Sequence, residues 1–253
     1  MKRVLTAAIA IPVVLAITLF APDWTFALVV GLVAAFAAEE FLSLGAGRGI
    51  GRPGKWFLLP VALVGASFIG GAEWVLSSLA ASVIALLTVT TFAGPLETAL
   101  GRAGIGLGAI VYCGLTLGFL VLLPRELVLL LFGIIWIGDS AAYYIGRAFG
   151  KHPLAPKISP KKTVEGGIAG LVASMLAGAI GGVWFLGEPW LSVTLIAGAT
   201  AVMGQIGDLA ESALKRSAAV KDSSSILPGH GGILDRLDSL FFAAPVFYWF
   251  FNT

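Results

Sequence analysis

One stretch of the chain gathers most of the residue types that phosphate chemistry needs. Residues 212–238 read SALKRSAAVKDSSSILPGHGGILDRLD, with four basic residues, three carboxylates and a Gly-His-Gly-Gly turn between two apolar segments. Glycine removes the Cβ atom and so lets a backbone approach a phosphate closely. Carboxylates bind Mg²⁺, while lysine and arginine neutralise phosphate oxygens. The segment therefore predicts a site for a phosphate-bearing ligand and a divalent metal.

The spacing of the carboxylates in this segment supports the metal. Asp235 and Asp238 stand three residues apart, so a helix would turn both side chains to the same face. A merely solvated loop has no need of paired acids beside a glycine turn. A structural role explains His230, which lies inside the turn, as well as ligand binding does.

A further acidic residue, Asp139, lies within an apolar run. On a helix Asp139, Tyr143 and Arg147 share one face, which leads from the apolar run to a basic loop. A charge at membrane depth is costly, so Asp139 is a candidate functional residue, with a structural ion pair as the alternative. Two adjacent glutamates, Glu39 and Glu40, lie at a membrane edge. Snorkelling or a salt bridge to a loop arginine explains them as well as a functional role does. Asp208 is the remaining acidic residue at membrane depth.

The loop after Arg147 is basic and stiff. Its proline residues exclude a regular helix and favour an extended backbone. Its lysines then project from a rigid segment, and the N-terminus of the next helix, opened by Thr163 and Glu165, offers free N–H donors. The prolines are Pro153, Pro156 and Pro160, and the lysines are Lys157, Lys161 and Lys162. We interpret the loop as a phosphate-binding surface, with a loop that only fixes topology as the alternative.

The composition indicates that the elements carrying these residues lie in a membrane. The 253 residues are 58% hydrophobic and 12% charged, with a mean hydropathy of +0.97. Soluble chains are about half apolar and about a quarter charged. Runs of about 20 apolar residues recur, each long enough to cross a hydrocarbon core of roughly 30 Å. The sequence predicts an all-α fold, a polytopic membrane bundle of about nine transmembrane helices. The expected spans are 4–20, 24–44, 56–71, 74–93, 104–123, 127–146, 166–187, 190–208 and 237–251.

The distribution of positive charge predicts the orientation. Fifteen of the sixteen Lys and Arg residues lie at the N-terminus or in alternate loops, and only Arg125 lies in a loop of the other set. The positive-inside rule makes the fifteen cytoplasmic. We therefore expect a multi-pass protein of the inner cell membrane, with a cytoplasmic N-terminus and a cytoplasmic site. The net charge of +2 is too small to indicate nucleic-acid binding.

No linker or repeat divides the sequence, so we expect one membrane domain over residues 1–253. In it, residues 1–125 are mainly scaffold spans, and residues 126–253 hold the catalytic spans and loops. Gly166 and Gly170 form a GxxxG pattern, which serves either packing within the chain or a homodimer. Cys113 lies in an apolar span and reads as an inert small hydrophobe. A cleaved signal peptide is the alternative to a retained first span.

The segment 212–238 resembles the signature of phosphatidate cytidylyltransferases, also called CDP-diacylglycerol synthases. No polar position departs from that pattern. A second similar stretch runs from Gly138 to Gly166, with Ser140 and Val164 in place of the Thr and Trp expected there. The signature residues are Ser212, Leu214, Lys215, Arg216, Lys221, Asp222, Pro228, His230, Gly231, Gly232, Ile233, Asp235, Arg236, Leu237 and Asp238.

The resemblance implies a reaction of CTP with phosphatidic acid in the lipid bilayer, giving CDP-diacylglycerol and pyrophosphate. It also implies Mg²⁺ and a second, monovalent cation such as K⁺. The expected metal ligands are Asp222, Asp235, Asp238 and Asp139, and the expected catalytic residues are Asp222, Asp235, Lys221 and Arg236. The expected substrate-binding residues are Lys215, Arg216, Lys161, Lys162, Ser212, His230, Gly231 and Gly232.

Two other kinds of function stay open on the sequence. A related CTP-dependent lipid enzyme, such as a polyprenol kinase or a cytidylyltransferase for another lipid phosphate, would share much of the same chemistry. A transporter for an anionic solute would also place Asp and Lys in a membrane. The charged groups gather at one face of the predicted bundle rather than at its midplane, which disfavours transport.

Overall fold

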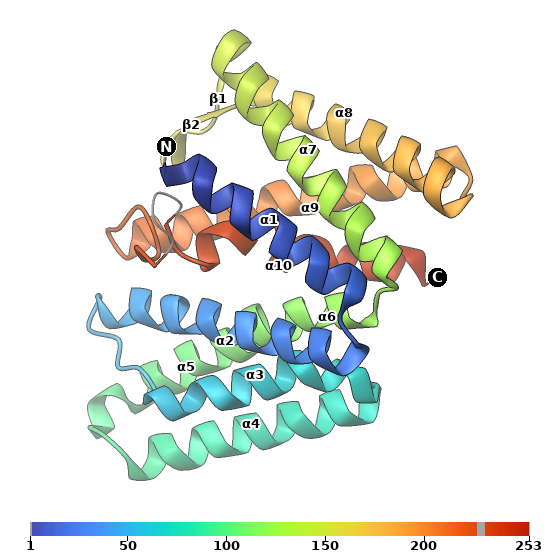
Figure 1. The fold of residues 1–253 in the computed structure, drawn as a ribbon. Coiled ribbons are helices and arrows are strands. Elements are labelled where there is room, and N and C mark those ends of the chain that lie inside the picture. The colour runs from blue at the N-terminus through green and yellow to red at the C-terminus, as the bar shows by residue number, and fades with distance from the viewer. Residues whose placement is uncertain (1, 227–230, 253) are drawn as a thin grey trace. The chain divides into compact units, whose positions relative to one another are not determined.

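A computed structural model describes the backbone of residues 2–226 and 231–252, and helices dominate it (Figure 1). The α-helices are α1 (Lys2–Phe20), α2 (Asp23–Ala46), α3 (Leu58–Ser67), α4 (Ala72–Phe92), α5 (Ala99–Ala109), α6 (Thr116–Leu122), α7 (Arg125–Phe149), α8 (Val164–Gly181), α9 (Trp190–Ser217) and α10 (Leu234–Phe251). Short 3₁₀ segments lie at Lys55–Phe57, Phe68–Gly70 and Leu96–Thr98, and π-helical segments at Ile110–Leu115 and Gly182–Leu186. A hairpin of β1 (Pro153–Ala155) and β2 (Ser159–Thr163) completes the described elements.

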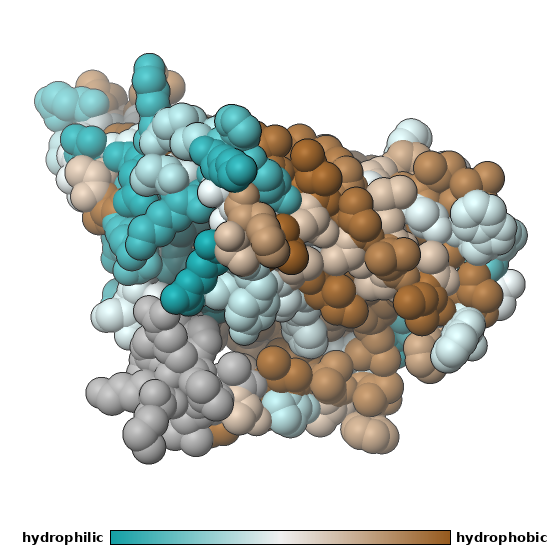
Figure 2. Space-filling view, turned by 90° about the horizontal axis from the view of Figure 1, so that it is seen from above, coloured by the Kyte–Doolittle hydropathy of each residue, from teal (hydrophilic) through white to brown (hydrophobic). Residues whose placement is uncertain are grey.

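The predicted membrane fold is confirmed. Every predicted span coincides with a helix or with a continuous run of helical segments. Among the described residues, six helices are long and apolar enough to cross a membrane, and Ala8–Phe20 and Lys55–Gly70 are shorter apolar helices. Many large hydrophobic side chains face outward, including Phe92 at 85% and Trp184 at 81% exposure, as a lipid-facing surface requires. Figure 2 shows such side chains over much of one face, with hydrophilic side chains gathered apart from them.

The chain divides into two compact units. The first unit comprises Met1–Leu122 and Leu214–Leu237, and the second comprises Leu123–Ala213 and Asp238–Thr253. The first unit therefore joins the N-terminal helices to a segment almost a hundred residues further along the chain. That segment carries most of the signature residues.

Small residues allow close helix packing in the first unit. A Cβ atom at Gly31 of α2 would collide with the carbonyl oxygen of Ala62 on α3, and one at Gly65 would lie 3.2 Å from the Gly31 Cα. The turn between α4 and α5 is held by the buried Arg102, which donates to the carbonyl oxygens of Thr90, Ala93 and Pro95. Arg102 thus anchors this turn.

The GxxxG glycines of α8 pack against α7 within the second unit. A Cβ atom at Gly166 would lie 2.7 Å from the carbonyl oxygen of Ala142, and one at Gly170 would lie 3.0 Å from that of Gly138. The Ser174 hydroxyl also donates to the Ile134 carbonyl at 2.8 Å. Packing within the chain therefore accounts for the glycine pattern, and a homodimer stays an untested alternative.

The proline-rich loop forms the antiparallel hairpin β1–β2, in agreement with the predicted extended backbone. Thr163 is the N-cap of α8, where its side chain accepts the Gly166 N–H at 3.2 Å. Glu165 accepts the backbone N–H groups of Lys151 and His152 and lies 2.6 Å from the His152 Nδ1. These contacts fix both ends of the hairpin to the start of α8.

Helix α9 ends at Ser217, nine residues beyond the end of the predicted span 190–208. Ala219 has a left-handed backbone, with φ of 60°. The Val220 N–H bonds to the Lys215 carbonyl and the Ala219 N–H to the Arg216 carbonyl, which is the Schellman arrangement. Ser212, Lys215 and Arg216 therefore lie on the last turns of α9, and a loop leads from there to α10.

Candidate active site

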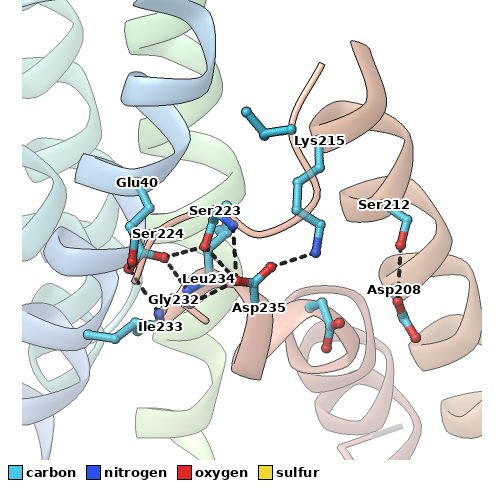
Figure 3. A network of polar contacts seen from close by, with 12 residues as sticks. Glu40, Asp208, Ser212, Lys215, Ser223, Ser224, Gly232, Ile233, Leu234 and Asp235 are labelled. Atoms are coloured by element: carbon cyan, nitrogen blue, oxygen red, sulfur yellow. Dashed lines mark hydrogen bonds and ion pairs between the residues drawn. The ribbon is translucent and has the colours of Figure 1, made fainter. Parts of the chain in front are cut away.

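Asp235, at the start of α10, is the acceptor for four donors of the first unit. The Lys215 Nζ donates to its Oδ1 at 2.5 Å. Its Oδ2 accepts the Gly232 N–H at 2.7 Å, and both the N–H and the hydroxyl of Ser223 at 3.0 Å. Figure 3 shows these groups converging on the carboxylate, Lys215 from α9 and Ser223 and Gly232 from the loop between α9 and α10. The structure thus joins two parts of the signature that lie twenty residues apart.

The environment of Asp235 keeps it ionised. The residue is only 6% exposed, and burial by itself raises the pKa of the carboxyl. The Gly232 N–H and the Lys215 ammonium outweigh burial, so the pKa of Asp235 lies below its ordinary value. The pair is a buried, charge-assisted contact that neutralises one carboxylate with one lysine.

A second buried carboxylate, Glu40 of α2, contacts the same loop (Figure 3). Its Oε1 accepts the Ser224 hydroxyl at 2.6 Å and the Ile233 N–H at 3.0 Å. Its Oε2 accepts the Ser223 hydroxyl at 2.7 Å and the Leu234 N–H at 2.8 Å. The side chain therefore binds the loop on one side and the first turn of α10 on the other.

The two described glycines of the Gly-His-Gly-Gly turn fit this network tightly. Gly231 has a φ of +80°, and a Cβ atom there would lie 2.5 Å from the Asp235 Oδ2. A Cβ atom at Gly232 would collide with both the Glu40 Oε2 and the Ser223 Oγ. Glycine at these positions is thus required by the carboxylates. Ligand approach had been the predicted reason, and it stays a prediction.

The other signature residues of the first unit are more open to solvent. Arg216 donates to the Val220 carbonyl at 3.1 Å, which holds it along the chain reversal after α9. Lys221, Asp222 and Arg236 are exposed. His230 and Pro228 lie outside the described residues.

The second unit holds a group of carboxylates on three helices. Asp208 and Glu211 of α9 and Asp139 of α7 lie close enough to Asp238 of α10 to interact with it electrostatically. Glu211 is fully buried. Lys162 of β2 forms an ion pair with Asp208, and the Ser212 hydroxyl lies 3.5 Å from the Asp208 Oδ1. Near the C-terminal end of α7, Arg147 donates to the Tyr143 hydroxyl at 3.4 Å. Lys161 of β2 is exposed.

These carboxylates match Mg²⁺ in donor chemistry, because Mg²⁺ prefers oxygen ligands of this kind. Within either unit, over residues 2–226 and 231–252, no three His, Cys, Asp or Glu side chains are arranged to hold a metal ion. The ligand set Asp222, Asp235, Asp238 and Asp139 therefore stays a prediction.

The sequence did not identify two residues of these networks, Glu40 and Glu211, as site residues. Glu40 stood out as a membrane-edge acid, but the sequence did not separate a functional role from a salt bridge. The salt bridge belongs to its neighbour, since Arg52 contacts Glu39 at 3.0 Å. Glu211 follows Asp208 by three residues on a helix, and that spacing was the signal available for it.

The fold defines a polytopic helical membrane protein, with networks of buried carboxylates in both units. The sequence profile of the cytidylyltransferase family matches residues 1–253. The chain belongs to this family.

Named relatives agree with the family assignment. A phosphatidate cytidylyltransferase of Staphylococcus haemolyticus is 36% identical over 261 residues, covering 96% of each chain. One of Staphylococcus saprophyticus is also 36% identical over 261 residues, again covering 96% of each chain. One of Bacillus subtilis is 52% identical over 117 residues, covering 46% of this chain and 44% of that protein.

Proposed function

We propose that this chain is a phosphatidate cytidylyltransferase, which converts CTP and phosphatidic acid to CDP-diacylglycerol and pyrophosphate. The observation that carries the proposal is the similarity, over nearly the whole chain, to proteins of that name. The membrane fold supports it, because one substrate is a lipid. The intact run of signature residues from Ser212 to Asp238 supports it as well.

The reaction exchanges one phosphorus–oxygen bond for another. An oxygen of the lipid phosphate bonds to the α-phosphorus of CTP, and the bond from that phosphorus to the bridging oxygen of the β-phosphate breaks. Pyrophosphate leaves with the electron pair of the broken bond. No covalent intermediate on the protein is required, so positioning and neutralisation of charge account for the rate.

The residue roles follow the resemblance and remain part of the proposal. Lysine and arginine side chains neutralise the triphosphate and the lipid phosphate, and the glycines let the backbone approach phosphate oxygens closely. Lys215 would combine substrate binding with its contact to Asp235. The substrate-binding set is Lys215, Arg216, Lys161, Lys162, Ser212, His230, Gly231 and Gly232, and Lys221, Arg236, Asp222 and Asp235 complete the catalytic set.

Mg²⁺ is the proposed cofactor, with K⁺ as a second, monovalent cation. When bound, Mg²⁺ would neutralise the charge that builds on the pyrophosphate leaving group. The residues proposed to hold it are Asp222, Asp235, Asp238 and Asp139. Asp208 joins them as a candidate because it lies beside Asp238 within the second unit.

The purified protein in detergent tests this function with CTP labelled in the cytosine ring, phosphatidate and Mg²⁺. We expect the label to enter the lipid fraction and pyrophosphate to appear in equal amount. Omission of Mg²⁺ should abolish both. Label that stays in the aqueous phase with intact, folded protein would refute the proposal.

The same assay separates the alternatives. A lipid kinase would transfer the γ-phosphate of CTP and leave the cytosine label in water, whereas a cytidylyltransferase for another lipid would require that lipid in place of phosphatidate. A transporter would move an anion into sealed vesicles without cleaving CTP.

A further inference from the structure

We infer that Glu40 is a positioning residue for the proposed cytidylyl transfer, acting through the loop that carries the signature. The inference rests on the proposed function. Glu40 lies on α2, far from the signature in sequence, and its carboxylate holds both ends of the segment from Ser223 to Leu234. It touches no atom expected to react.

The number and kind of its contacts separate Glu40 from an ordinary buried acid. Each carboxylate oxygen accepts one serine hydroxyl and one backbone N–H, so four donors surround a side chain that is 2% exposed. A buried carboxylate is stable only when its charge is matched by donors or cations. These four donors come from the loop or from the start of α10. Holding that segment is therefore what these contacts do.

One side chain, that of Ser223, links Glu40 to Asp235. The Ser223 Oγ lies 2.7 Å from the Glu40 Oε2 and 3.0 Å from the Asp235 Oδ2. The backbone also links the two acids. The Gly232 N–H donates to Asp235, and the Leu234 N–H, two residues on, donates to Glu40. A shift of Glu40 would therefore shift the hydrogen-bond donors of Asp235 and, with them, its pair with Lys215.

Helix α2 provides a firm support for this role. It is 24 residues long and packs on α3 through Gly31 and Gly65. Beyond its C-terminus, the Arg48 Nε donates to the Ser217 carbonyl at 2.5 Å, at the end of α9. The loop is thus tied to the α2 region both where it leaves α9 and where it enters α10. A functional group held by rigid elements keeps its geometry better than one on a free loop.

Substitution of Glu40→Gln tests the inference, with Glu39→Gln as the matched control. Glu39 is the adjacent residue, but it pairs with Arg52 and is partly exposed. We expect Glu40→Gln to lower kcat/KM for CTP, per folded molecule, by roughly ten- to a hundredfold. Amide hydrogen exchange of residues 218–226 and 231–235 should rise in the same variant. Glu39→Gln should leave both within about twofold, since it removes no contact to the loop.

Two milder variants cover the case in which Glu40→Gln does not fold. Glu40→Asp keeps the charge and should recover part of the activity. Ser224→Ala removes one donor to Glu40 without touching Asp235 and should lower kcat/KM by a smaller factor, about fivefold. The inference is overturned if the folded variants match Glu39→Gln in kcat/KM, or if activity falls with no change in exchange of the loop.

Failure of the proposed function is a separate result. If the wild-type protein transfers no cytidylyl group, that function is refuted, and hydrogen exchange alone decides what Glu40 does. Unchanged exchange of the loop in Glu40→Gln would then refute the positioning role too.

Discussion

The Ser223 hydroxyl has one hydrogen and two carboxylate neighbours. It lies within 3.0 Å of both Glu40 and Asp235, so it can donate to only one of them at full strength. The other hydrogen bonds to the Asp235 carboxylate come from backbone N–H groups of the loop and from Lys215. The site residues of the first unit are therefore linked, and a change at one acid is expected to disturb the other.

Asp235→Asn is the sharpest test at the residue scale. The amide keeps the size of the side chain, but it loses the charge that pairs with Lys215 and that a metal would need. We expect the initial rate of cytidylyl transfer per folded protein to fall by at least about a hundredfold, while the protein still inserts and folds. Glu188→Gln, at an exposed position, is the control. Near-normal turnover of Asp235→Asn would contradict the role of this carboxylate.

For these residues the sequence predicts a chemical role, but it does not predict most of their hydrogen-bond partners. The signature predicts that Asp235 and Lys215 serve one site, and the 2.5 Å contact agrees with that. Glu40 contacts residues 183–194 positions away, and no local pattern encodes such a contact. The sequence around a glutamate at a membrane edge does not show whether its side chain snorkels, pairs with an arginine or binds a distant loop.

At the scale of elements, spans and the hairpin were predictable because each follows from a local physical rule. Apolar runs of sufficient length predict membrane helices, and prolines at 153, 156 and 160 predict an extended loop. The end of α9 was not predictable in the same way. The helix ends at Ser217, and the left-handed residue that follows is Ala219, where glycine is usual, so the sequence carries no clear stop signal there.

The packing of α7 on α8 gives a prediction about stability. Gly166→Ala would place a Cβ atom 2.7 Å from the Ala142 carbonyl oxygen, so the two helices must separate slightly. We expect a loss of about 1–3 kcal/mol in stability and a lower Tm in detergent. Gly133→Ala on α7 is the matched control, because nothing lies within 4 Å of its Cβ position. Equal Tm values for the two variants would show that the close approach does not matter.

At the scale of the whole molecule, charge distribution predicts the orientation that the proposed function needs. CTP is a soluble nucleotide, so the loops that bind it must face the cytoplasm. The fifteen basic residues assigned to the cytoplasmic side include those of the hairpin and of the 212–238 segment. Composition and charge thus predict the membrane fold and its direction, whereas the contacts inside each unit depend on tertiary structure.

A cysteine-labelling experiment tests the orientation, and the chain suits it because its only cysteine, Cys113, is buried. We expect Glu188→Cys to react with a membrane-impermeant maleimide in intact cells. Lys157→Cys, in the hairpin loop, should react only after the membrane is opened. The reverse pattern would place the signature on the wrong side of the membrane for CTP.

The central claim, that this chain joins a cytidylyl group to phosphatidate, is tested most directly by the mass of the lipid product. The purified protein is incubated with CTP, Mg²⁺ and a phosphatidate of defined acyl chains, and the extracted lipid is analysed by mass spectrometry. We predict one new lipid, heavier than the substrate by one cytidylyl group, formed in step with pyrophosphate and missing when Asp235→Asn replaces the wild type. A lipid of unchanged mass, or one heavier by a single phosphate, would contradict the claim.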